Sequence, residues 1–401
     1  MPPRSLIHPP TLEAHPAGAA ILAKGFRPFF LMAAAYAVLT LPLWVLVLYG
    51  RLDPGAYLGA TGWHAHEMVF GFSVAVIAGF LLTAVGNWTQ RETAVGLPLA
   101  LLCLLWLAGR VAVLFADGFP PKLAAALDLA FLPALAFACA RPILASKNRR
   151  NYGFIAILAA LFGANLAVHL GALGVLPAWT RLGSLLGVDL VTIVIVIVTG
   201  RIVPMFTRNA TGRQGIVNVP VLDRAAIAAM VLVVATGVLM PGSAVSGVAL
   251  LLAGVFVAAR AARWGMQHTF GNPLLWILHV GHAWVAIGLL LRGASVLVPA
   301  VPSSMGLHAL TAGAIGALTL GMMARVSLGH TGRMLAAPKL VSVAFVVITV
   351  ATLLRIVAPL AGASQLPLLA VAGSLWALSF AAYLVSYAPM LLSPRVDGRP
   401  G

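Results

Sequence analysis

The stretch at residues 62–72, GWHAHEMVFGF, places His64, His66, Glu67 and Met68 at the start of a long apolar run. Ionisable residues inside a membrane are costly and usually functional. Imidazole nitrogens bind copper, iron and zinc, and a thioether binds Cu(I) and some haem iron. The two cysteines form no C-x-x-C pair, so no thiolate metal site is indicated. These ligand types point to haem iron, copper or both, and away from Mg²⁺ or Ca²⁺, which prefer several carboxylates.

Histidines on two other apolar runs are predicted to lie at the same depth as this pair. His169 is in the outer half of the fifth run, and His308 begins the tenth. Each histidine alone could be structural, but four at one depth favour a shared metal or haem site. On a helix, His64 and His66 point to nearly opposite sides. Either one of them binds and the other supports it, or the helix begins later and His64 lies in the preceding loop.

A second set of histidines is predicted nearer the opposite face. His279 and His282 are three positions apart and share a helix face. His330 follows the tenth run, about 33 Å along a helix from His308, so these two cannot bind one metal. Either there are two sites at two depths, or the inner histidines are structural.

Few other ionisable residues fall within the apolar runs. The arginines at their outer ends would pair with haem propionates, or would only extend toward the interface; they are Arg110, Arg292 and Arg355. The acids within a few turns of the outer surface are Glu67, Asp128 and Asp189. They would orient a binding imidazole or carry protons, and Asp128 and Asp189 would equally serve as polar contacts between helices.

The elements that must position these residues are membrane-spanning helices. Of the 401 residues, 61% are hydrophobic and only 8% are charged, against about 25% charged in soluble domains. The apolar runs are near 20 residues long, the length of a membrane span. We predict an all-α polytopic membrane protein with about twelve spans. These cover residues 28–49, 64–86, 95–116, 122–146, 152–176, 181–206, 219–240, 243–263, 273–297, 303–327, 338–360 and 366–391.

The formal net charge of +16 fits membrane topology better than nucleic-acid binding. With the N-terminus inside, 19 of the 25 Lys and Arg residues fall at inner ends, which predicts that both termini are cytoplasmic. We expect a cytoplasmic tail at 1–26 without a secretory signal peptide, one membrane domain at 27–392 and a cytoplasmic tail at 393–401. The longest loop is expected around 200–215.

Several stretches resemble the NnrS family. They are GFRPFFL (25–31), WHAHEMVFGFSVAVIAGFLLTAVGNWT (63–89), GRIVPMFTRN (200–209), PLLWILHVGHAW (273–284) and GLHALTAGAIGALTLGMMARVSLGHTGR (306–333). The resemblance covers about residues 20–390. It implies a multi-pass protein of the bacterial inner membrane that contains haem, expected to be type b, and copper. The family's histidines fall on His64, His66, His169, His279, His308 and His330, and Asp128 and Asp189 also fit its patterns.

The resemblance further implies a role in nitric oxide metabolism or nitrosative-stress resistance. NO reduction would need two electrons and two protons per pair of NO molecules, with Glu67, Asp128 and Asp189 as candidate catalytic residues. The histidines expected to bind metal are His64, His66, His169, His279 and His308, and His330 joins them as a cofactor contact. The expected partners are membrane lipid, NO and an unidentified electron donor, without nucleic acid. The alternatives are a transporter or metal-handling protein, or a haem-based NO sensor without turnover.

Overall fold

The computed structural model describes residues 20–118 and 120–399, so most of the predicted tail at 1–26 lies outside the described residues. All regular secondary structure in the described part is helical. Twelve helical stretches there are long and apolar enough to cross a membrane. The predicted fold class and the number of spans are therefore confirmed.

Most spans are single helices, and three are built from shorter segments. The single helices are α1 (Phe26–Leu48), α4 (Leu97–Leu114), α7 (Tyr152–Ala172), α8 (Trp179–Thr211), α9 (Pro220–Leu239), α10 (Ala244–Ala261), α11 (Pro273–Leu297), α14 (Lys339–Val357) and α15 (Gln365–Leu392). The second span is α2 (Gly59–His66), the π-helical segment η2 (Glu67–Ser73) and α3 (Val74–Thr89). The fourth is α5 (Pro121–Leu129) and α6 (Phe131–Ala145). The tenth is α12 (Ser303–His308), the π-helical segment η6 (Ala309–Ile315) and α13 (Gly316–His330).

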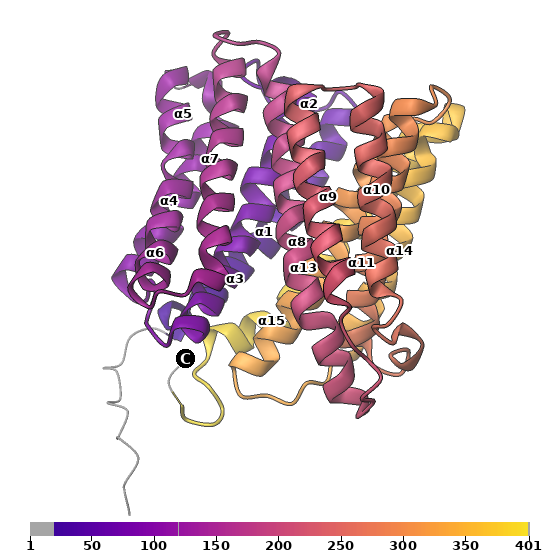
Figure 1. The fold of residues 1–401 in the computed structure, drawn as a ribbon. Coiled ribbons are helices and arrows are strands. Elements are labelled where there is room, and N and C mark those ends of the chain that lie inside the picture. Colours follow the sequence, from indigo (N-terminus) through magenta and orange to yellow (C-terminus); the bar gives the residue numbers. More distant parts are fainter. Residues whose placement is uncertain (1–19, 119, 400–401) are drawn as a thin grey trace, which may run out of the picture.

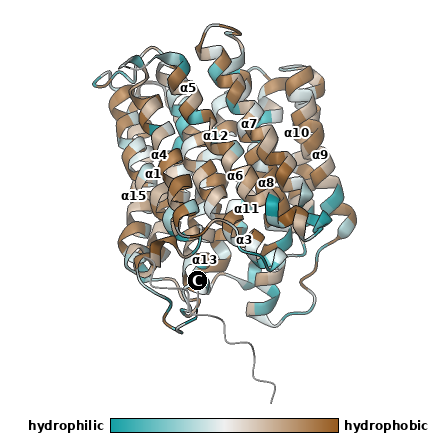
Figure 2. Ribbon diagram, turned by 90° about the vertical axis from the view of Figure 1, so that its left-hand side faces the viewer, coloured by the Kyte–Doolittle hydropathy of each residue, from teal (hydrophilic) through white to brown (hydrophobic). Residues whose placement is uncertain are grey.

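Helices that follow one another in the chain pack side by side, and α1 also packs against α15, so the first and last spans are neighbours (Figure 1). The long helix α8 contacts both π-helical segments, η2 and η6. The second, sixth and tenth spans therefore meet inside the bundle. Hydrophobic residues cover most of the helix surfaces, as expected where helices face lipid (Figure 2).

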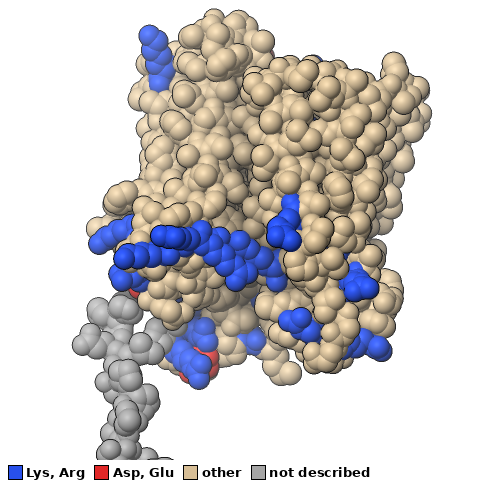
Figure 3. All heavy atoms as spheres, viewed as in Figure 1, with Lys and Arg blue, Asp and Glu red and all other residues tan. Residues whose placement is uncertain are grey.

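The start of α1 and the end of α15 lie at the same face of the bundle. The Arg27 guanidinium donates to the carbonyls of Leu391 at 2.8 Å and Ser393 at 2.7 Å. Lys and Arg side chains form a band near this end (Figure 3). This basic end is the one that the positive-inside rule predicts to face the cytoplasm.

The prediction of a long loop around 200–215 is wrong for residues 200–211, because α8 continues to Thr211. Residues in this extension contact neighbouring spans: Thr207 with His279, and Arg201 with Asn151. The helix ends where Gly212 adopts a left-handed φ of 68°, a conformation that glycine takes without steric cost.

Candidate functional site

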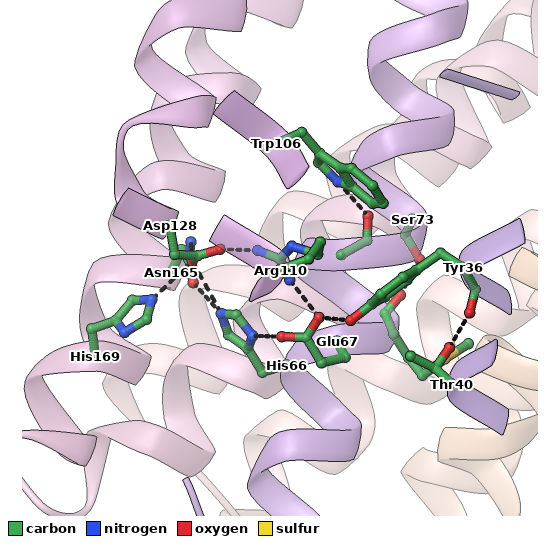
Figure 4. Close-up of polar contacts among 12 residues, drawn as sticks. Tyr36, Thr40, His66, Glu67, Ser73, Trp106, Arg110, Asp128, Asn165 and His169 are labelled. Atoms are coloured by element: carbon green, nitrogen blue, oxygen red, sulfur yellow. Dashed lines mark hydrogen bonds and ion pairs between the residues drawn. The ribbon is translucent and has the colours of Figure 1, made fainter. Parts of the chain in front are cut away.

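A network of buried polar side chains surrounds His66 (Figure 4). Its Nδ1 lies 2.9 Å from Glu67 Oε1, and its Nε2 lies 3.2 Å from Asp128 Oδ2 and 3.0 Å from Asn165 Oδ1. Asp128 Oδ2 also lies 2.8 Å from His169 Nε2 and accepts from Asn165 Nδ2 at 2.7 Å. The four ionisable residues are at most 2% exposed. The second, fourth and fifth spans thus bring two imidazoles and two carboxylates together away from solvent.

Arg110 on α4 joins the two carboxylates of this network. Its Nη1 donates to Glu67 Oε2 at 2.7 Å, and its Nη2 forms an ion pair with Asp128 Oδ1. The Tyr36 hydroxyl of α1 donates to Glu67 Oε2 as well. The alternative prediction for the outer arginines is that they only extend toward the membrane interface. Arg110 does not, because it is only 5% exposed. With both carboxylates ionised and the imidazoles neutral, the network carries a net charge of −1.

The network reaches the outer surface through Tyr57, in the loop before α2. The Tyr57 hydroxyl lies 2.8 Å from His169 Nδ1. Burial raises the pKa of Tyr57 to about 12, so its hydroxyl stays protonated at neutral pH. Tyr57 also lines a surface pocket of about 640 Å³ with Asp117 and Lys122. This pocket therefore gives small solutes access to the edge of the network.

The π-helical segment η2 explains how the second span presents its polar residues. Widening the helix frees backbone carbonyls, and two side chains satisfy them: Trp106 Nε1 donates to Gly71 O at 3.1 Å and Ser73 Oγ donates to Met68 O at 2.7 Å. A Cβ on Gly71 would lie 3.0 Å from both Arg110 Nη1 and Glu67 Oε2. The glycine therefore allows this ion pair to form against the helix backbone. Single π turns are frequent at functional sites.

The tenth span repeats this arrangement. Its π-helical segment η6 begins directly after His308, as η2 begins directly after His66. Trp376 Nε1 from α15 donates to Ala312 O at 3.1 Å. Two histidines thus stand at the entrances to two π turns, each of which is supported by a tryptophan from a neighbouring span.

His64 faces a different place from His66. Its ring stacks on Trp44 with the ring centroids 4.3 Å apart, and it lines a cavity of about 1120 Å³. Met68 and His308 line the same cavity. The structure confirms that His64 and His66 point to opposite sides, and it places Met68 on the same side as His64. The four outer histidines form two groups: His66 with His169, and His64 with His308.

The cavity wall is mostly apolar but carries cationic groups. Arg355 Nη2 donates to His308 Nε2 at 2.9 Å, and His308 Nδ1 donates to the Ser304 carbonyl at 2.8 Å. These contacts assign the His308 proton to Nδ1. Arg292 also lines the cavity and forms an ion pair with Asp189. Two of the three predicted outer arginines therefore lie at this cavity, and Arg110 does not.

The inner histidines contact neighbouring helices and belong to neither outer group. His279 Nε2 lies 2.9 Å from Thr207 Oγ1. His282 contacts Thr199 Oγ1 at 3.1 Å through Nδ1 and the Val257 carbonyl at 3.2 Å through Nε2. His330 packs its ring against Phe26, with the centroids 5.5 Å apart. These contacts agree with the alternative in which the inner histidines are structural residues and do not form a second metal site.

Sequence reasoning missed three residues of the buried network: Asn165, Tyr36 and Tyr57. Asn165 precedes His169 by four positions, and residues four apart on a helix share a face. That spacing was a usable signal. Tyr57 carries no comparable signal, because a tyrosine near the end of a membrane span is common. Tyr36 lies in the middle of α1 with no other ionisable residue of the network at helical spacing.

These features define a polytopic α-helical membrane protein with histidine-rich sites in one half of the bundle. The sequence matches the NnrS protein family over residues 20–395, nearly the whole chain, and the chain belongs to this family. The resemblance read from the sequence is thereby confirmed, and the family connects the chain with nitric oxide. No curated protein matches the chain.

Proposed function

We propose that the chain is a haem- and copper-binding protein of the bacterial inner membrane that acts on nitric oxide. The observation that carries this proposal is the cavity of about 1120 Å³ that His64 and His308 line together with Arg292 and Arg355. Ligand sites are typically mostly apolar cavities with a few convergent polar groups. NO is small and uncharged, so an apolar cavity admits it at no electrostatic cost.

The residues around this cavity fit a haem. An imidazole from His64 or His308 would hold the haem iron, and Arg292 and Arg355 would pair with the propionates. The Nδ1–H bond from His308 to the Ser304 carbonyl directs the lone pair of Nε2 toward the cavity, as metal-binding histidines require. That lone pair now accepts from Arg355. Ligation through His308 would therefore release the Arg355 guanidinium to pair with a carboxylate.

A haem iron at this cavity would supply a site that binds NO. The chain's own residues would supply positive charge and protons. Asp189, held by Arg292 at the cavity, would be the nearest carboxylate for proton transfer. Glu67 and Asp128 would act from the neighbouring buried network. Reduction of two NO to N₂O and water would consume two electrons and two protons, with the electrons coming from a donor protein or a membrane-soluble reductant.

The test is the absorbance spectrum and metal content of protein purified from haem-replete cells. We expect a Soret band that shifts when NO is added, and loss of that band in His308→Gln or His64→Gln. The matched control is His268→Gln, because His268 is exposed in a loop at the opposite face. A colourless wild-type protein without iron or copper would refute the proposal.

The same preparation separates an enzyme from a sensor. With a chemical reductant present, an NO electrode would record continuous consumption by an NO reductase. A sensor would bind one equivalent of NO, shift its spectrum and consume no more. Loss of consumption in Asp189→Asn with an unchanged spectrum would assign Asp189 to proton delivery.

A further inference from the structure

We propose that His66, Asp128 and His169 form a separate site for one divalent transition metal, distinct from the cavity of His64 and His308. The inference deepens the proposed function by giving its non-haem metal a location and a donor set. His66 Nε2, Asp128 Oδ2 and His169 Nε2 all lie within 4.8 Å of one another. They come from the second, fourth and fifth spans, so the folded bundle creates the site.

The distances between the donor atoms suit direct coordination. Asp128 Oδ2 lies 2.8 Å from His169 Nε2 and 3.2 Å from His66 Nε2. Ligands around a tetrahedral metal with bonds near 2.1 Å are roughly 3.4 Å apart. The two distances from Asp128 lie within about 0.6 Å of this spacing. The two imidazole nitrogens lie within 4.8 Å of each other, so side-chain rotation could bring all three atoms onto one ion.

Each of the three residues has a partner that would hold it as a ligand. His66 Nδ1 faces Glu67 Oε1 at 2.9 Å, and His169 Nδ1 faces the Tyr57 hydroxyl at 2.8 Å. With the protons on both Nδ1 atoms, the Nε2 lone pair of His169 faces Asp128 Oδ2. That of His66 faces Asp128 Oδ2 and Asn165 Oδ1, which lies 3.0 Å away. Such hydrogen bonds to the second ring nitrogen are a regular feature of metal-binding histidines.

Charge gives an independent reason for a cation here. The charges of Glu67, Asp128 and Arg110 sum to −1, and these side chains are almost completely buried. A buried charge without compensation is strongly unfavourable. A divalent cation bound by neutral imidazoles would change this net charge from −1 to +1. An additional proton on His66, the competing explanation because both His66 nitrogens face acceptors, would bring it to zero.

The donor set indicates which metals would bind. Two imidazoles and one carboxylate leave coordination positions open, the pattern of non-haem iron sites, and they also suit Zn²⁺ and Cu²⁺. With no thiolate or thioether among these three ligands, the set disfavours Cu(I). The surface pocket beside Tyr57 gives the ion a route from the outer face.

The experiment is a Co²⁺ titration of full-length protein stripped of metal with a chelator and held in lipid nanodiscs. We expect one Co²⁺ per chain with visible ligand-field bands, displaced by Zn²⁺, and pulsed EPR of bound Cu²⁺ reporting two imidazole nitrogens. His169→Gln and Asp128→Asn should each weaken binding by more than 100-fold. Tyr57→Phe should weaken it about 10- to 100-fold, the usual effect of losing a partner of a ligand.

The matched controls are His64→Gln and His308→Gln. Both should retain Co²⁺ binding, and the variant that lacks the haem-binding imidazole should lose the Soret band. Because Asp128→Asn also removes a partner of Arg110 and could impair folding, His169→Gln and the wild-type titration decide the question without it. No stoichiometric Co²⁺ band in wild-type protein would overturn the inference and favour the proton on His66. Binding that survives His169→Gln, or that disappears in His308→Gln, would also overturn it. The haem spectrum and Co²⁺ binding are separate readouts, so failure of the proposed function is distinguishable from failure of this inference.

Discussion

Arg110→Met should be the most destabilising single change in the buried network, because it leaves two carboxylates without their shared counter-charge. Arg110 contacts Glu67 through one terminal nitrogen and Asp128 through the other. Methionine has a similar length and keeps the apolar contacts of the side chain. The change therefore removes charge and hydrogen bonds more than volume.

The magnitude follows from the separation and the burial of the charges. At the 2.7 Å between Arg110 Nη1 and Glu67 Oε2, Coulomb attraction at an effective dielectric of 20 is about 6 kcal/mol before desolvation. Breaking a buried ion pair on one side costs about 3–5 kcal/mol, because the remaining charge stays uncompensated. We expect a loss in this range. The double variant Glu67→Gln/Arg110→Met should recover much of it, since only the Asp128 charge then remains.

The assay is reversible unfolding in mixed micelles titrated with a denaturing detergent, followed by circular dichroism. Arg355→Met is the matched control: the partner described for Arg355 is the imidazole of His308, so its removal leaves no buried anion. A loss below about 1 kcal/mol in Arg110→Met, the range of an exposed ion pair, would refute the reasoning. A double variant no more stable than Arg110→Met would refute it as well.

Four further substitutions test other parts of the structure. Trp106→Phe and Trp376→Phe each remove the donor to a carbonyl of a π-helical segment and should each cost about 1–3 kcal/mol in the same unfolding assay; no loss in either would contradict this role. Because burial raises the pKa of Tyr57 from 10 to about 12, the unfolded chain ionises first as pH rises, and stability from this group should fall between those values. The difference in tyrosinate absorbance between wild-type protein and Tyr57→Phe reports the ionisation of Tyr57. This difference should titrate with a midpoint near 12, and a midpoint near 10 would contradict the burial of Tyr57. Asp189→Asn should lower the free energy of unfolding by about 2 kcal/mol, because it weakens the contact with Arg292. An unchanged free energy of unfolding would show that this ion pair does not stabilise the protein.

The sequence predicted the helical membrane fold because twelve long apolar runs have no other stable form in lipid. It also predicted that His64 and His66 differ in role, because the helical period assigns them to opposite faces. It did not predict the extent of α8. The helix continues to Thr211 because its polar residues there find partners on other spans, and such partners are not visible in the local sequence.

The sequence by itself determined the number of spans, since this depends on hydropathy. The side of the basic residues and the depth of each histidine are predictions from loop charge and helix rise. Only the tertiary structure decided that GWHAHEMVFGF faces two places: His66 meets Asp128 and His169, and His64 shares a cavity with His308. The physical reason is that spans apolar on nearly all sides carry little information about which faces meet. Packing of the spans, and the π turns after His66 and His308, set those contacts.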